Sequence, residues 1–594
     1  MHELEIPPAI ELPIVDTLSS IPARNAVAFP DRPTYAIRTG DGWTDVTARR
    51  FNEQVRAVAR GLIARGVAAG SAVAIMSPTR YEWTVLDFAL WTAGAYAVPI
   101  YESSSAEQIE WILDDSGSRI VIADSAAAAA RVREGTPNAP PIWVMDDGLL
   151  EELAAEGAAA SDEVLTTRAE AVRPHDTATI VYTSGTTGRP KGCVITHSNL
   201  LFVVRTLVAS TQPIVTEPGA RTVLFLPLAH VLGRGAHLYC AEGGMQVAHC
   251  PSPRQLPADM ATFRPTFLVG VPRVFEKVFA SAQQKAHSEG KGRIFERAAR
   301  VAIDYGRARQ GHRPALRLRA EHALFDRLVY SRIRQAMGGQ LSYAITGGAS
   351  LGERLGHFYA GIGLTVVEGY GLTESTASGT FNRAEGPRIG SVGQPMPGTA
   401  VRIAEDGEIW LRGPHIMAGY HRNATDTAEL IDAEGWLRTG DLGSMDAEGY
   451  LRITGRKKEM IVTAGGKNVA PAVLEDRIQA NVLVSQAIVV GEGRPFVGAL
   501  ITLDPDALAK WAAERGLAGR TLGALRADPA LRAEIQSAVD HANSAVSRAE
   551  SIRVWRLLDA QLSEASGHIT PTQKLKRSVV TRDFADEIEA IYAR

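Results

Sequence analysis

A short loop of unusual composition follows an apolar stretch of the chain. The run 178–184 (ATIVYTS) leads into YTSGTTGRPKG at positions 182–192. Glycines let backbone N–H groups come close to an anion, hydroxyls donate further hydrogen bonds, and Lys191 adds positive charge. The loop therefore predicts a cradle for phosphate groups. The residues expected to line it are Thr183, Ser184, Gly185, Thr186, Thr187, Gly188 and Lys191.

This loop is not a Walker A motif. Pro190 stands before Lys191, where Walker A has a glycine. The plainer alternative is a flexible loop of small polar residues without a ligand. A linker has no reason to end in a Pro-Lys-Gly turn directly after a strand, so the phosphate cradle is the favoured interpretation.

Four further segments follow this loop along the chain. They are 370–374 (YGLTE), 435–442 (GWLRTGDL), 455–471 (GRKKEMIVTAGGKNVAP) and 570–577 (TPTQKLKR). Over nearly the whole chain, the five segments in this order resemble the motifs of the acyl-adenylate-forming superfamily. That superfamily includes acyl-CoA synthetases, luciferases and the adenylation domains of peptide synthetases.

The resemblance implies a complete site for ATP. Tyr370 would pack on adenine, Thr373 would contact the α-phosphate, and Asp441 and Arg456 would bind the ribose. Glu374 would bind Mg²⁺ together with Thr186, because a hard cation prefers oxygen ligands and bridges to nucleotide phosphates. Without the resemblance, Glu374 would be read as an ordinary loop acid. The other positions expected along the nucleotide are Gly347, Gly348, Glu368, Gly369 and Gly371.

The last two motifs imply a C-terminal domain that moves between two reactions. Lys458 matches the hinge residue of the superfamily. Gly465 and Gly466 match the loop that faces the reaction centre when a thiol attacks.

The motif at 570–577 implies a catalytic lysine. Lys574 matches the residue that neutralises charge between the substrate carboxylate and the α-phosphate. The commonest form of the motif has glycine before this lysine, whereas this chain has Gln573. Lys576 is the competing choice, and the spacing to Arg577 favours Lys574.

Two segments point to a fatty acyl substrate. The runs 226–234 (LPLAHVLGR) and 264–277 (RPTFLVGVPRVFEK) resemble segments of the long-chain fatty acyl-CoA synthetase branch. The first would place His230 beside the acyl group. A lone histidine is as readily a structural group as a substrate contact, so both interpretations of His230 stay open.

These motifs together imply a ligase reaction in two steps. A medium- to long-chain fatty acid attacks the α-phosphorus of ATP, and coenzyme A then opens the resulting acyl-AMP. An acyl-AMP ligase that loads a carrier protein is the alternative. Its extra segment, which obstructs domain rotation, is not evident between 411 and 456. A non-catalytic relative is disfavoured because Lys191, Glu374, Asp441 and the C-terminal lysine are present.

The composition fits a folded, soluble chain. The 594 residues are 45% hydrophobic and 22% charged, and the formal net charge of −3 is too balanced for nucleic acid as a bulk partner. Cys193, Cys240 and Cys250 form no CxxC pair, which predicts reduced thiols and a cytoplasmic protein. The acidic, proline-interrupted start is wrong for a signal peptide. The sequence indicates no oligomeric state.

Elements of two kinds must position these residues. Apolar runs at 71–77, 119–124, 178–184, 222–228, 266–271 and 341–347 alternate with helical stretches. This alternation predicts mostly parallel sheets covered on both faces, with ligands at the carboxyl ends of the strands. After residue 400, short strands and glycine turns predict an α+β region. We therefore expect an α/β fold with a layered domain at 1–455 and a smaller α+β domain at 456–594. The resemblance implies that this fold is of the acyl-adenylate-forming type and that the smaller domain is mobile.

Two segments raise the question of a membrane. The run 83–100 is mostly apolar but contains Asp87 and Pro99, which predicts a buried helix and strand instead of a membrane span. The segment 276–340 is rich in arginine and alanine and predicts helices added to the sheet body. A solvated helical surface is the simpler interpretation of it, and peripheral contact with anionic lipid is the alternative.

Overall fold

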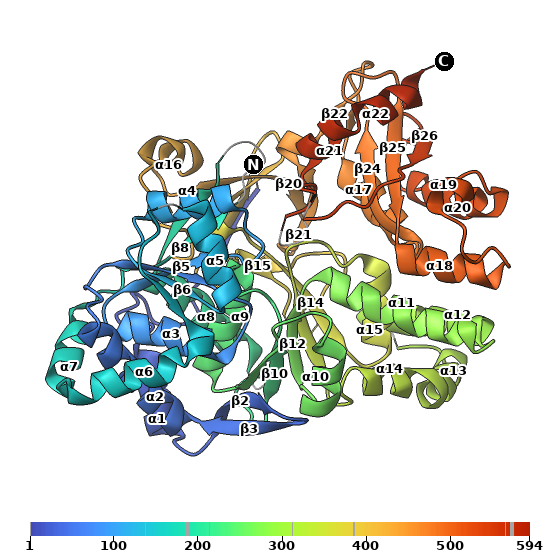
Figure 1. Cartoon of the computed structure of the whole chain (residues 1–594). Helices are drawn as coiled ribbons and strands as arrows, with labels where there is room; N and C mark the ends of the chain where they lie inside the picture. Colours follow the sequence, from blue (N-terminus) through green and yellow to red (C-terminus); the bar gives the residue numbers. More distant parts are fainter. Residues whose placement is uncertain are drawn as a thin grey trace. The chain divides into compact units, whose positions relative to one another are not determined.

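The computed structural model describes residues 2–136, 138–183, 189–212, 214–311, 313–383, 386–564, 566–570 and 575–593. The chain forms two compact units. The first holds residues 1–402, 410–439 and 445–451, and the second holds 403–409, 440–444 and 452–594. In Figure 1 the first unit runs from blue to yellow, and the second is mainly orange and red.

A seven-stranded sheet in the first unit carries the expected phosphate loop. Strands β5, β4, β6 and β7 pair in parallel, β8 joins β5 in parallel, and β8 and β9 are antiparallel. The strand order is β19 (Gly419–Tyr420), β9 (Lys191–Thr196), β8 (Thr177–Thr183), β5 (Tyr96–Ile100), β4 (Ala72–Met76), β6 (Val121–Ala123) and β7 (Ile142–Val144).

A nine-stranded sheet carries the expected adenine segment. Its strands from β14 to β2 are parallel, and antiparallel strands extend it at both edges. The order is β16 (Gln394–Pro395), β15 (Thr380–Phe381), β14 (Thr365–Tyr370), β13 (Tyr343–Thr346), β12 (Phe267–Gly270), β10 (Arg221–Leu224), β11 (Gln246–His249), β2 (Pro33–Thr39) and β3 (Gly42–Thr47).

Both faces of the seven-stranded sheet are covered, as the apolar runs predict. Along β4, Val73 and Ile75 belong to the main hydrophobic core, whereas Ala72, Ala74 and Met76 belong to a second core. Successive side chains of a strand point to opposite faces, so these two cores lie on either side of the sheet. A strand buried on both faces has no polar alternation, which explains the continuous apolar runs.

The apolar run 83–100 forms a buried helix and strand, as predicted. Helix α3 (Tyr81–Thr92) is buried from Trp83 to Thr92 and is followed by β5. Among the described residues, no helix is long and apolar enough to cross a membrane.

The arginine-rich segment forms a layer of helices. It contains α11 (Pro272–Ser288), α12 (Gly292–Gly311), α13 (Leu316–Phe325), the π-helical turn η3 (Asp326–Tyr330) and α14 (Ser331–Ala336). Helix α12 packs closely on α15 (Glu353–Gly361), because a side chain at Gly306 or Gly361 would collide with the backbone of the other helix. Figure 1 shows α11 and α12 in light green and α13 and α14 in yellow-green, close to one another.

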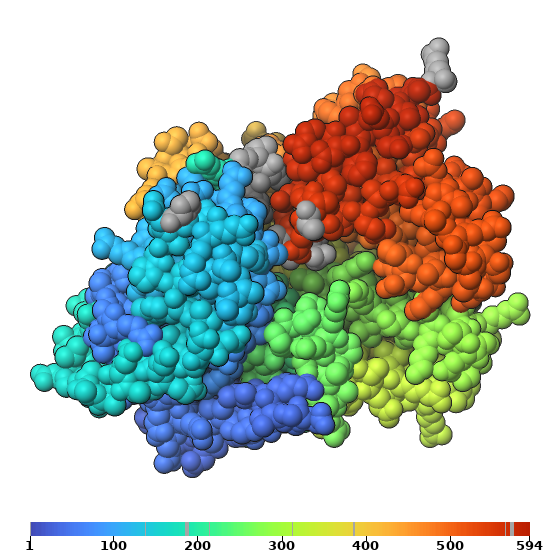
Figure 2. Space-filling view, viewed as in Figure 1, coloured from blue at the N-terminus to red at the C-terminus, as the bar shows by residue number. Residues whose placement is uncertain are grey.

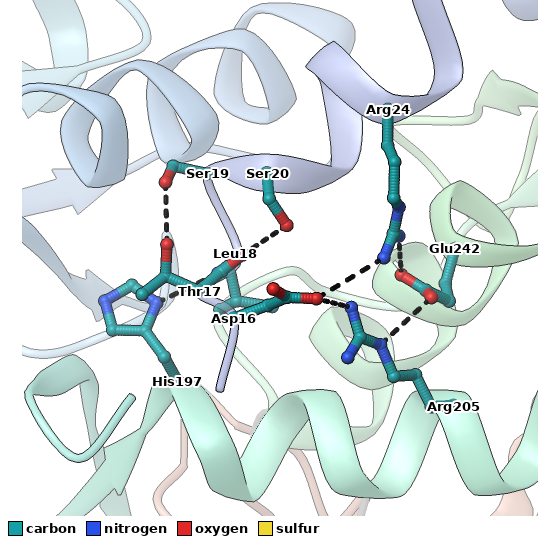
Figure 3. Close-up of polar contacts among 9 residues, drawn as sticks. All are labelled: Asp16, Thr17, Leu18, Ser19, Ser20, Arg24, His197, Arg205 and Glu242. Carbon is teal, nitrogen blue, oxygen red and sulfur yellow. Dashed lines mark hydrogen bonds and ion pairs between the residues drawn. The ribbon is translucent and has the colours of Figure 1, made fainter. Parts of the chain in front are cut away.

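The N-terminal segment is tied to the helices α8 (His197–Thr211) and α9 (Val231–Gly243). Arg205 bonds Asp16 at 2.6 Å and Glu242 at 3.2 Å (Figure 3). The backbone N–H of Leu18 donates to Nδ1 of His197 at 3.3 Å. Burial lowers the pKa of His197 to about 4, so its imidazole is a neutral acceptor at neutral pH.

The second unit is a small α+β body with its own cores, as predicted. It has a two-stranded sheet of β22 (Ile461–Val462) and β23 (Asn468–Val469), and a three-stranded sheet. The latter orders β24 (Val484–Val490), β25 (Val497–Leu503) and β26 (Ile552–Leu557). Its helices include α17 (Pro471–Gln479), α18 (Pro505–Glu514), α20 (Pro529–Asn543), α21 (Arg577–Asp583) and α22 (Ala585–Tyr592).

Candidate active site

The hairpin of β8 and β9 frames the expected phosphate loop. Thr183 is the last residue of β8 and pairs with Lys191, the first residue of β9. Gly192 is required here, because a Cβ at this position would lie 2.7 Å from Cγ2 of Ile180. Ser184, Gly185, Thr186, Thr187 and Gly188 lie outside the described residues, so their binding roles stay predictions.

Lys191 lies in a cluster with residues from three other segments. It forms an ion pair with Asp426, near the start of α16 (Ala424–Leu430), and its Nζ lies 5.2 Å from the ring centroid of Tyr420. The Tyr420 hydroxyl donates to Oε1 of Glu374 at 2.8 Å. The structure thus brings together Lys191 and Glu374, the residues predicted to bind phosphate and metal.

The adenine segment lies beside the glycine pair. In the parallel pairing of β13 and β14, Thr346 is the register partner of Glu368. Gly347 follows directly, and a Cβ there would lie 3.4 Å from the carbonyl oxygen of Gly369. Gly348 has a φ of +82°, which favours glycine. The two segments predicted to border adenine are therefore adjacent in space.

Glu368 has a structural contact in addition to its predicted role. Its Oε1 accepts the backbone N–H of Leu351 at 2.8 Å, and burial raises the pKa of its carboxyl. The residues after β14 are tightly packed, since a Cβ at Gly371 would lie 2.4 Å from the backbone nitrogen of Ser378. Tyr370 ends β14 and Thr373 begins the 3₁₀ helix η4 (Thr373–Ser375).

His230 has a clear structural role at the start of α9. Its Nδ1 accepts the backbone N–H of Leu232 at 3.1 Å and so caps the helix. This contact supports the structural interpretation of His230, and direct contact with an acyl group stays a prediction.

One turn further along α9, the fully buried Arg234 forms an ion pair with the fully buried Asp87 of α3. Burial raises the pKa of Asp87 to about 6, and the charge of Arg234 limits that rise.

The second unit contains the residues predicted to bind ribose. Asp441 lies on β20 (Leu437–Met445) and Arg456 ends β21 (Leu451–Arg456). These two strands are neighbours in one sheet. Nε of Arg456 donates to Oδ1 of Asp441 at 2.8 Å, so the two predicted ribose ligands are in direct contact.

The predicted hinge and thioester loop follow in the second unit. Lys458 lies in the 3₁₀ helix η5 (Lys457–Glu459), whose neighbouring Lys457 bonds Glu408 at 3.1 Å. Gly465 and Gly466 lie in the turn between β22 and β23, and the φ of +73° at Gly466 favours glycine. Lys574 lies outside the described residues.

Comparison with known proteins identifies the family. Residues 22–421 match the family model described as AMP-binding enzyme, and residues 458–594 match the AMP-binding enzyme C-terminal domain. The chain belongs to the AMP-binding enzyme family.

The family includes a relative that is similar over its full length. The chain is 47% identical over 599 residues to long-chain-fatty-acid–CoA ligase FadD15 of Mycobacterium bovis, covering 100% of both chains. Solved structures of the same fold include an anthranilate CoA ligase with anthranoyl-AMP, at 19% identity and a TM-score of 0.72, covering 97% of this chain and 98% of that one. A Mycobacterium tuberculosis fatty acyl CoA synthetase gives 24% identity and a TM-score of 0.61, covering 96% and 99%. At these identities the two structures show the fold alone.

Sequence reasoning missed two residues of the candidate site, Tyr420 and Asp426. Tyr420 lies at the C-terminal end of the segment that matches the AMP-binding enzyme model, and Asp426 lies just beyond it. They reach the site because β19 pairs with β9, which places Tyr420 opposite Cys193. A two-residue strand carries no periodic signal, so only the structure finds this pairing.

Proposed function

We propose that the chain converts a medium- to long-chain fatty acid to acyl-AMP at the expense of ATP and transfers the acyl group to coenzyme A. AMP and pyrophosphate are the other products. The observation that carries this proposal is the 47% identity, over the whole chain, to a long-chain-fatty-acid–CoA ligase. The shared contact of Lys191 and Glu374, the predicted phosphate and metal residues, with Tyr420 supports it.

In the first step, the protein positions two anions and neutralises charge. The fatty acid carboxylate is already ionised at neutral pH and attacks the α-phosphorus without a general base. Lys191 and the loop after Thr183 hold the phosphate oxygens. The proposed role of Lys574 is to neutralise the negative charge that accumulates between the carboxylate and the α-phosphate in the transition state.

Glu374 is suited to hold Mg²⁺ with the help of the nucleotide. The described residues contain no group of three or more His, Cys, Asp or Glu side chains that could enclose a metal. A single carboxylate suits Mg²⁺ when substrate phosphates and water supply the other oxygens. When bound there, the cation would supply positive charge to the leaving pyrophosphate.

In the second step, coenzyme A attacks the acyl-AMP. We place the domain boundary at residues 455 and 456 and the hinge at Lys458. Rotation about this hinge would withdraw Lys574 and bring in Gly465 and Gly466, whose lack of side chains leaves room for the thiol. The ribose stays bound by Asp441 and Arg456.

The adenylation step is tested by exchange of labelled pyrophosphate into ATP without coenzyme A. We expect exchange that depends on a fatty acid and on Mg²⁺. Exchange that is absent with short, medium and long fatty acids would contradict the proposal. If exchange occurs but coenzyme A fails to increase AMP release, the alternative of an acyl-AMP ligase serving a carrier protein replaces the second step.

We also propose a cytoplasmic protein whose helical layer touches anionic membrane. Residues 291–340 contain 12 Lys and Arg against 4 Asp and Glu. Within this basic segment, Leu316, Leu324 and Leu328 are 81%, 56% and 50% exposed. The region forms part of the outer surface in Figure 2, in yellow-green. Exposed leucines among cations suit the interface of an anionic bilayer, where long fatty acids also reside.

The side of α13 that faces away from Leu316 and Leu324 packs against another helix. His322 stacks on Tyr305 of α12 at 3.8 Å between ring centroids. The leucine side is therefore the one left for a partner. Co-sedimentation with phosphatidylglycerol vesicles should show binding that weakens at high salt. The double variant Leu316→Ser, Leu324→Ser should lose this binding, while Val27→Ser, at another exposed apolar position, should retain it. Absence of binding by the parent protein would contradict the proposal.

A further inference from the structure

The residues predicted to bind the pyrophosphate end of ATP come from two different sheets. Lys191 starts β9 of the seven-stranded sheet, and Glu374 follows β14 of the nine-stranded sheet. Their side chains must act on the same triphosphate. The fold therefore needs a connection that fixes one relative to the other.

Tyr420 provides this connection. Its hydroxyl donates to Oε1 of Glu374 at 2.8 Å, and its ring faces the ammonium group of Lys191 at 5.2 Å. One side chain thus contacts both the predicted metal ligand and the predicted phosphate ligand.

The backbone around Tyr420 is held firmly. Tyr420 is paired with Cys193 of β9, and the N–H of His421 donates to the carbonyl of Gly192 at 2.7 Å. The N–H of Tyr420 donates to Oγ1 of Thr427 at 2.9 Å. The same segment also binds the backbone of Glu374, whose carbonyl accepts the N–H of Met417 at 2.9 Å. These bonds fix the position from which the hydroxyl acts.

We propose that Tyr420 is a positioning residue for the metal-binding carboxylate, which it orients toward the nucleotide. This inference rests on the proposed role of Glu374. A carboxylate that accepts a fixed hydrogen bond at one oxygen loses rotational freedom, and the other oxygen is then directed without further ordering cost. Outer hydrogen bonds of this kind commonly change metal affinity 10- to 100-fold.

The test measures the effect of Mg²⁺ on ATP binding. Titration calorimetry without fatty acid gives the dissociation constant of ATP in EDTA and in Mg²⁺. The constant in EDTA divided by the constant in Mg²⁺ is the factor by which the metal tightens ATP binding, and we call this factor the ratio. Tyr420→Phe removes one O–H group and keeps the ring over Lys191. We expect the ratio to fall about ten-fold in this variant, with ATP binding in EDTA unchanged.

Two further variants make the result specific. Tyr239→Phe removes a hydroxyl from the buried pair with Thr211 and should leave the ratio unchanged. Glu374→Gln should lower the ratio, and adding Tyr420→Phe to it should cause no further fall, because the hydroxyl acts through the carboxylate.

The outcomes separate this inference from the proposed function. An unchanged ratio in Tyr420→Phe with a lowered ratio in Glu374→Gln would overturn the role of Tyr420 alone. An equal loss of affinity with and without Mg²⁺ in Tyr420→Phe would also overturn it. An unchanged ratio in Glu374→Gln would remove the metal role of Glu374 and the inference with it.

Discussion

The two proposed reaction steps depend on different residues of the second unit. Lys574→Ala should slow acyl-AMP formation about 100-fold or more, because one positive charge is lost where negative charge accumulates. Thioester formation from synthetic acyl-AMP and coenzyme A should be nearly unchanged. Single-turnover assays of each half-reaction measure both effects. Lys576→Ala is the matched control, and if that variant alone loses adenylation, the catalytic lysine is Lys576.

Gly466→Leu should show the opposite pattern. A leucine would fill the space through which the thiol approaches, so thioester formation should fall at least ten-fold while acyl-AMP formation continues. Gly516→Leu is a fair control for backbone strain, since Gly516 has a similar φ of +71° against +73°. Equal thioester rates in the parent and the Gly466 variant would remove this loop from the reaction centre.

The residues that could be predicted are those whose neighbours along the chain reveal them. Each of Thr183, Gly347 and Tyr370 ends or follows an apolar run. In the structure, Thr183 and Tyr370 are the last residues of strands, and Gly347 directly follows one. Tyr420 and Asp426 could not be predicted in this way. Their partners Glu374 and Lys191 are distant in sequence. The pairing of β19 with β9, which brings Tyr420 to the site, is only two residues long.

At the scale of elements, helices α3 and α9 are joined by a charge pair in the core. The sequence reveals Asp87 as a charge within an apolar helix, but its partner Arg234 is recognisable only once the helices are packed. Asp87→Ala should destabilise the protein by about 3–5 kcal/mol, because it leaves a buried guanidinium without a counter-charge.

A double variant separates charge from packing at the same place. Asp87→Leu together with Arg234→Met removes both charges and should recover most of the lost stability. Urea unfolding followed by tryptophan fluorescence measures each free energy. A double variant that is less stable than Asp87→Ala would contradict this prediction, because the ion pair would then stabilise the fold by more than the cancelling of its two charges.

At the scale of the whole molecule, acid should destabilise the first unit. Burial lowers the pKa of His197 and His249 to about 4 and that of His415 to about 3, against about 6.5 in an unfolded chain. Between these values the unfolded chain binds protons that the folded chain excludes. The contribution of these histidines to the free energy of unfolding is therefore fully present above pH 6.5 and is lost as the pH falls toward 4. At pH 5 the loss is about 2 kcal/mol for each histidine.

This pH dependence can be assigned to one residue. The loss of unfolding free energy between pH 7.5 and pH 5 should be smaller by about 2 kcal/mol in His197→Gln than in the parent. Glutamine does not titrate, so the dependence of the unfolding free energy on pH becomes weaker even if the variant is less stable at every pH. An identical loss in the two proteins would contradict the neutral, buried state of His197.

The product that the whole protein forms tests the proposed reaction most directly. Mass spectrometry after incubation with ATP, Mg²⁺, coenzyme A and a mixed pool of short, medium and long fatty acids identifies that product and the preferred chain length together. We predict acyl-CoA from medium or long fatty acids, with one AMP formed for each thioester. Acyl-AMP without thioester, or neither product from any acid in the pool, would contradict it.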